Sequence, residues 1–125
     1  MTGAAPYLAL VVAHYRRPQN QRFLPRATHR HEGANTVCGD RMRMELELRE
    51  GRVVDAAFQA SACAIATASA SLLTERVRGV GLAEIASLDD DMIVAALGEG
   101  VPAPRRPCAT LPLRVLREAL AHGGR

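Results

Sequence analysis

The stretch "NTVCGDRMRMELELREGRVVDAAFQASAC", residues 35–63, decides the fold that this sequence predicts. From position 41 to position 49, polar residues alternate strictly with the apolar residues Met42, Met44, Leu46 and Leu48. Side chains of a β-strand point to opposite faces in turn, so this period predicts a strand with one buried face.

A second strand is predicted directly after this one. Glu50 and Gly51 form a turn, and the β-branched residues Val53 and Val54, with Phe58 beyond them, favour extended structure. The two strands would make an antiparallel hairpin, in which the start of the first strand lies beside the end of the second.

The hairpin explains the placing of two of the three cysteines. Cys38 precedes the first predicted strand and Cys63 follows the second. The two thiols are therefore expected to converge at the open end of the hairpin.

Five helices are predicted before and after the hairpin. One is expected before it, at residues 8–15, and one directly after it, from residue 64 to a stop at Gly79. The other three are expected at residues 82–86, after the N-capping acids of residues 89–91, and from Thr110 onward. Pro18 should end the first of the five. Residues 19–33 are predicted to be a polar segment, and residues 101–107 a stiff, extended linker. The small residues at 64–71 indicate close packing of a helix on the sheet.

Length and composition favour one compact domain over residues 1–125. The chain has 125 residues, a mass of 13.4 kDa and 48% apolar residues, which is enough for a core without disulfides. The apolar run at residues 7–13 is too short to cross a bilayer and has no cleavage site after it, so we expect a cytoplasmic protein with no membrane partner.

Charge and aromatic content argue against nucleic acid as a partner. The formal net charge is only +3, every basic residue is an arginine, and aromatic residues make up 3% of the chain. Scattered arginines are usual on a solvated surface, and few aromatic rings leave little for bases to stack on.

The cysteines and one acid form a candidate metal-binding set. Cys63 and Cys108 are both predicted near helix N-termini, where the helix dipole favours a thiolate over a thiol. With Cys38 and Asp40 they supply three sulfur ligands and one carboxylate, enough for a tetrahedral site.

Plainer explanations apply to each of these residues alone. A lone cysteine is commonly a small buried hydrophobic residue, an aspartate after a glycine is commonly a turn residue, and the sequence has no Cys-x-x-Cys pair. Metal or sulfur chemistry and a purely structural role therefore both stay open on this evidence. No role is assigned to His14, His29, His31 or His122, and the serines have no partners for a hydrolase triad.

Four ordered motifs resemble a known family, the iron–sulfur cluster scaffold proteins IscU and SufU and the N-terminal domain of NifU. The matching segments are "HYRRPQN" at residue 14, "NTVCGDRMRMEL" at residue 35, "CAIATASASLLTERVRG" at residue 63 and "RRPCATLPLRVL" at residue 105. The resemblance covers residues 7–120, and all three cysteines are in register with it.

The resemblance implies a fold, a ligand set and a function. The fold would be α+β, with helices on one face of a small antiparallel sheet. Cys38, Asp40, Cys63 and Cys108 match the family's metal and cluster ligands, and Arg105 matches the SufU arginine before the third cysteine. The implied function is to receive sulfur from a cysteine desulfurase, assemble a [2Fe-2S] cluster and pass it to apo acceptor proteins, with Zn²⁺ as an alternative occupant.

Three departures from the family pattern bear on mechanism. Pro107 stands where IscU has a histidine, and the SufU-type insertion between the second and third cysteines is absent. The chaperone-binding motif of IscU is only faintly echoed at residues 101–105, which argues against a dedicated Hsp70 partner.

Three functions use the same four ligands and stay open. The first is a scaffold that holds a labile cluster and is not an enzyme. The second is a zinc-dependent sulfur acceptor in which Cys108 would receive the persulfide, and the third is a metal with a purely structural role.

Overall fold

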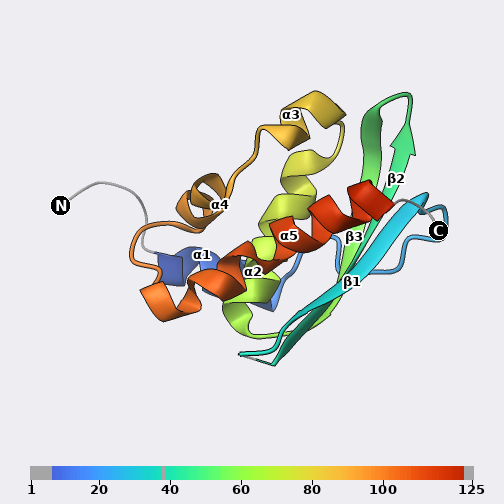
Figure 1. Ribbon diagram of the computed structural model, residues 1–125. Coiled ribbons are helices and arrows are strands. Elements are labelled where there is room, and N and C mark those ends of the chain that lie inside the picture. The colour runs from blue at the N-terminus through green and yellow to red at the C-terminus, as the bar shows by residue number, and fades with distance from the viewer. Residues whose placement is uncertain (1–6, 38, 123–125) are drawn as a thin grey trace.

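The computed structural model describes residues 7–37 and 39–122, which form a small sheet with helices packed on one side of it (Figure 1). In chain order the elements are α1 (Tyr7–Arg16), β1 (His29–Asn35), β2 (Asp40–Arg49), β3 (Arg52–Ser61), α2 (Ala64–Val77), α3 (Leu82–Ala86), α4 (Asp90–Leu97), the 3-10 turn η1 (Ala103–Arg105) and α5 (Arg106–His122).

The predicted hairpin is present as β2 and β3. The strands pair antiparallel from Arg41 opposite Ser61 to Arg49 opposite Arg52. Between them Glu50 and Gly51 have positive φ angles of 51° and 77°, the two-residue turn whose twist matches that of the flanking strands. The open end of the hairpin lies at the lower end of the sheet in Figure 1, where α2 begins.

The prediction of a polar segment at residues 19–33 was incomplete, because β1 occupies its second half. This strand pairs antiparallel with β2, from His29 opposite Leu46 to Asn35 opposite Asp40, and completes a sheet of order β1-β2-β3. β1 is an edge strand with the sequence HRHEGAN, and backbone pairing with β2 holds it in the sheet. Because most of its side chains are not buried, its sequence lacks the apolar alternation that identified β2.

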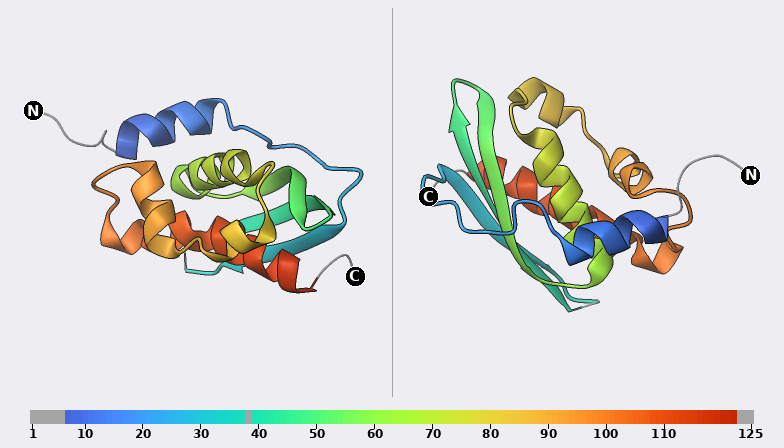
Figure 2. Two further views of the ribbon diagram at one scale, coloured as in Figure 1. Left: turned by 90° about the horizontal axis from the view of Figure 1, so that it is seen from above. Right: turned by 180° about the vertical axis from the view of Figure 1, so that it is seen from behind.

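One face of the sheet carries the core, and α2 and α5 cover it (Figure 2). The buried residues of this face include Met42, Met44, Leu46, Val53 and Phe58. The predicted close packing of the small residues is confirmed, since α2 contacts α1, α4, α5 and β3, and Ala66, Ala68, Ser69, Ala70 and Ser71 are all buried. Small side chains allow the neighbouring backbones to approach on several sides.

The "HYRRPQN" motif ties the chain after α1 to α2. The hydroxyl of Ser71 lies 2.8 Å from His14 Nδ1 and accepts a hydrogen bond from the backbone N–H of Gln19 at 2.7 Å. Asn20 Nδ2 donates to Thr74 Oγ1 at 3.1 Å. The motif thus provides hydrogen-bond partners for the buried hydroxyl groups of Ser71 and Thr74 on α2.

The C-terminal half confirms the short helices and corrects the linker. The helix α3 has its predicted bounds, and α4 is capped by Asp89, whose side chain accepts from the N–H of Met92 at 2.9 Å. The segment 101–107 was wrongly predicted to be an extended linker, because η1 occupies part of it and α5 begins at Arg106. A proline in the first turn of a helix gives up no hydrogen bond, so Pro107 is compatible with an early start.

Among the described residues no helix is both long enough and apolar enough to cross a bilayer.

Candidate metal centre

Three of the four predicted ligands meet at the open end of the hairpin. The ligand atoms of Asp40, Cys63 and Cys108 all lie within 4.8 Å of one another. They come from the first residue of β2, the residue before α2 and the first turn of α5, so three separate elements contribute to one cluster.

Asp40 is buried and its two carboxylate oxygens both face Cys63. Oδ1 accepts a hydrogen bond from the Cys63 backbone N–H at 2.8 Å, and Oδ2 lies 3.9 Å from Cys63 Sγ. The side chain of Asp40 is only 2% exposed. A buried carboxylate needs such a partner, and here the partner is the backbone of a second candidate ligand.

Cys63 is the N-cap residue of α2, as the sequence predicted. Its backbone is extended, with φ −66° and ψ 167°, and its sulfur accepts from the N–H of Ala66 at 3.5 Å. Cys63 is half-buried, and the N–H of Ala66 is one of the groups in the first helical turn that would otherwise lack a partner. Sulfur here takes the place of the oxygen that usually caps a helix.

Cys108 lies inside α5, which corrects the prediction that it precedes its helix. It is in the first turn and has no exposed surface. Asn35 Nδ2 lies 3.9 Å from its sulfur. Cys108 is thus at a helix N-terminus, as predicted, and its buried sulfur is one of the three clustered ligand atoms.

Cys38, the fourth predicted ligand, lies outside the described residues. Its described neighbours are Val37, which is 91% exposed, and Gly39, which has a φ of 75°. A positive φ favours glycine, so Gly39 supplies a left-handed conformation just before β2. The role of Cys38 as a ligand stays a prediction.

The donor set fits a metal ion that accepts both sulfur and oxygen. Two cysteine sulfurs and a carboxylate are ligand types that Zn²⁺ takes in tetrahedral sites and that iron takes in clusters. The four described histidines lie outside this cluster. His31 instead faces Glu118, with 3.4 Å between Nε2 and Oε1, and its ring centre is 5.9 Å from that of His122.

Asn35 was not singled out as a site residue from the sequence, although it opens the motif that contains Cys38 and Asp40. Its contact with Cys108 spans 73 positions of the chain. No local pattern indicates a contact of that range, because it depends on how α5 packs beside β1.

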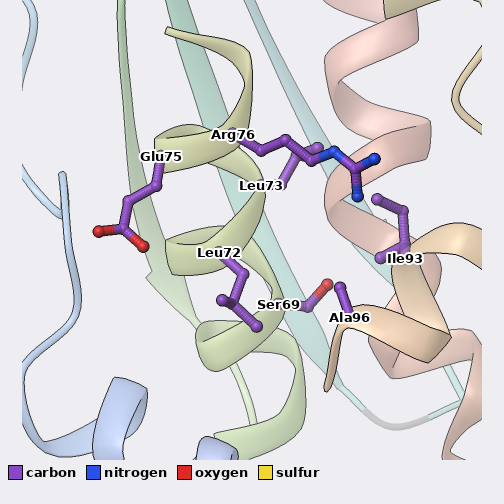
Figure 3. Close-up of a pocket in the computed structure, with 7 residues that line it drawn as sticks. All are labelled: Ser69, Leu72, Leu73, Glu75, Arg76, Ile93 and Ala96. Atoms are coloured by element: carbon purple, nitrogen blue, oxygen red, sulfur yellow. The ribbon is translucent and has the colours of Figure 1, made fainter. Parts of the chain in front are cut away.

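An apolar recess of about 290 Å³ lies between α2 and α4, apart from the ligand cluster (Figure 3). Leu72, Ile93 and Ala96 line it, and Arg76 extends across it. A second recess of about 290 Å³ is lined from the end of β1 and the first half of α5, and Pro107, the residue before Cys108, is part of its lining. This recess is polar, since its other lining residues include Asn35, Thr36, Thr110 and Arg114.

The fold and the site together define a class: a small α+β domain with a candidate metal centre of two cysteines and one aspartate at the end of its sheet. The model of the NifU-like N terminal domain matches residues 6–122. The chain belongs to this family, whose members include iron–sulfur cluster scaffold proteins.

Individual relatives support the assignment. The chain is 32% identical over 114 residues to the iron–sulfur cluster assembly scaffold protein IscU 1 of Archaeoglobus fulgidus, covering 91% of this chain and 74% of that protein. It is 29% identical over 132 residues to the zinc-dependent sulfurtransferase SufU of Bacillus subtilis, covering 92% and 89%. Relatives thus carry both names, scaffold and sulfurtransferase.

Solved structures show the same fold. A putative scaffold protein for the SUF system from Fervidobacterium islandicum superposes with a TM-score of 0.73 at 21% identity, over 89% of this chain and 93% of that one. A hypothetical protein solved at 2.3 Å resolution gives the same TM-score at 26% identity, over 92% and 96%. The expected α+β architecture is confirmed.

Proposed function

We propose that this protein is a scaffold on which a labile [2Fe-2S] cluster is built and from which it is passed to apo acceptor proteins. Cys38, Asp40, Cys63 and Cys108 would hold the cluster. The observation that carries the proposal is the convergence of Asp40, Cys63 and Cys108, from three elements, within 4.8 Å. The cluster is cargo in this scheme, so the protein would not be an enzyme, and its place of work would be the cytoplasm.

The mixed ligand set supports release as well as binding. Thiolates are the preferred ligands of iron–sulfur clusters, and a carboxylate is a harder and weaker partner for them. Asp40 would therefore be the labile ligand, whose dissociation allows the cluster to leave.

Sulfur would come from the persulfide of a cysteine desulfurase. Cys108 is our candidate acceptor, and its thiolate would attack the outer sulfur of the persulfide, forming a new persulfide and releasing the desulfurase thiolate. Because the side chain of Cys108 is buried, the first turn of α5 has to open before this attack. The polar recess next to Pro107 and Thr110 is the side from which we expect access.

A zinc-dependent sulfur acceptor is the alternative, and the Bacillus subtilis relative favours it. In that case Zn²⁺ would hold the same thiolates until one of them is loaded with sulfur. Pro107 leaves no histidine beside Cys108 to replace a loaded thiolate, so loading would require the metal to move. For this reason we place the scaffold first.

One experiment separates the two proposals. Alanine production by a cysteine desulfurase is measured with metal-free, zinc-loaded and iron-supplied protein, and cluster formation is followed by visible absorbance. A scaffold should accept sulfur best without zinc and develop cluster absorbance with iron, because zinc blocks the thiolates that it binds. Strong stimulation by the zinc form alone, with no cluster formed, would reverse the order.

A further inference from the structure

Asn35 is a buried amide beside the candidate metal centre. It is the last residue of β1, lies opposite Asp40 in the sheet register, and is 9% exposed. Arg114 Nη2 of α5 donates to the carbonyl of Ala34, the residue before Asn35, at 2.5 Å. This bond ties the end of β1 that carries Asn35 to the middle of α5.

The two ends of this amide face two different parts of the centre. Its oxygen accepts a hydrogen bond from the backbone N–H of Val37 at 3.3 Å, two residues further along the chain. Its nitrogen lies 3.9 Å from Cys108 Sγ. An amide whose oxygen faces an N–H group turns its donor group the other way, and here that direction leads to the sulfur.

We propose that Asn35 is a positioning residue of the metal centre, which donates a hydrogen bond to the Cys108 thiolate while its oxygen sets the backbone that leads into residue 38. This proposal rests on the proposed function, because it assumes that Cys108 binds the metal. Outer hydrogen bonds of this kind orient a ligand and withdraw charge from a ligated sulfur, which changes both metal affinity and cluster potential.

The chemistry of an amide suits a centre that must release what it holds. A carboxylate would repel the thiolates or become a further ligand. An amide stabilises the thiolate by one neutral donor and adds no charge to a cluster that already contains Asp40.

Two substitutions separate the two contacts. Asn35→Ser keeps a side-chain oxygen that can accept from the N–H of Val37, but it is too short to reach Cys108. Asn35→Ala removes both contacts. Thr110→Ala is the matched control, because Thr110 lines the same polar recess and its hydroxyl bonds to the carbonyl of Pro107.

The readouts are zinc affinity, measured by competition with a chelator, and the sulfur-to-metal charge-transfer bands of the Co²⁺-loaded protein. We expect both Asn35 variants to bind zinc about 10- to 100-fold more weakly than wild type, which is the usual effect of removing an outer hydrogen bond. Their cobalt bands should shift, and Thr110→Ala should match wild type in both measurements.

Three results would overturn the proposal. Wild-type affinity and bands in Asn35→Ser would reduce Asn35 to a turn residue. A loss of affinity matched by an equal loss of stability in the metal-free variants, with unshifted cobalt bands, would make its role purely structural. Failure of the wild-type protein to bind zinc or cobalt would instead remove the centre itself, and the proposed function with it.

Discussion

At the scale of single residues, Asp40 combines two roles that a sequence motif cannot separate. Its carboxylate is one of the candidate ligands, and its Oδ1 also accepts the N–H of Cys63 at 2.8 Å. The second role holds the start of α2 against the start of β2. Substitutions at this position therefore change both the centre and the fold.

Replacing Asp40 by alanine should slow cluster release. Without the carboxylate, a more slowly exchanging ligand or a closed pocket takes the place of this weakly bound ligand. A reconstituted cluster should therefore persist longer and transfer more slowly to an apo acceptor. Transfer is followed by visible absorbance, and unchanged or faster transfer would contradict the release role.

The metal-free Asp40→Ala protein should also lose about 1–3 kcal/mol of unfolding free energy, whereas Asp40→Asn keeps an acceptor for Cys63 and should lose less.

Residue patterns predicted some of these environments and not others. Cys63 was placed at a helix N-terminus because the small, helix-favouring residues after it mark a start, and the structure confirms this. Glu45 lies on the side of β2 that its alternation predicts to be polar, yet it is only 4% exposed. Leu24 and Gln59 donate to its carboxylate at 3.0 and 2.9 Å, so the segment before β1 covers it. The burial of Glu45 depends on a segment about 20 residues earlier in the chain, and the alternation of polar and apolar residues within a strand does not indicate such a contact.

At the scale of elements, the packing of α5 on β1 sets the position of Cys108. Gly33 of β1 lies directly under α5, since a Cβ built on it would come 2.8 Å from Val115 Cγ2. The absence of a side chain at this position allows the helix to approach the strand. Cys108 lies two turns before Val115 on the same helix, so a displaced α5 also displaces a ligand.

Gly33→Ala should therefore weaken both stability and metal binding. We expect a loss of about 1–3 kcal/mol in unfolding free energy from overpacking, measured by urea denaturation, together with weaker zinc binding in chelator competition. Val115→Ala removes the clashing methyl groups, so the double variant should be more stable than the sum of the two single losses predicts. Strictly additive losses would show that the two residues do not oppose each other.

The elements differ in how well the sequence predicted them, for physical reasons. The hairpin was predicted because β2 buries one face and its turn needs a left-handed glycine. The edge strand β1 was missed because backbone pairing forms it without an apolar face. The start of α5 was placed too late because Pro107 was taken as part of an extended linker, although a helix tolerates proline in its first turn.

At the scale of the whole molecule, the candidate centre joins parts of the chain that otherwise pack through different surfaces. Its described ligands come from the sheet, from the central helix α2 and from the C-terminal helix α5. A metal ion bound there would connect all three. Binding energy gained only in the folded state adds directly to the free energy of unfolding.

Metal removal should therefore lower the thermal stability of the wild-type protein. At a free metal concentration 100-fold above the dissociation constant, binding contributes about 2.7 kcal/mol, which a melting curve with and without chelator resolves easily. Cys63→Ser should lose most of this response, because serine is a poor substitute for a thiolate ligand. Ser61→Ala is the matched control, since Ser61 is exposed at the end of β3 and lies outside the ligand cluster. If chelator shifted the melting temperature of Cys63→Ser as much as that of wild type and Ser61→Ala, the stabilising metal would lie elsewhere, and the centre at the end of the hairpin would have to be abandoned.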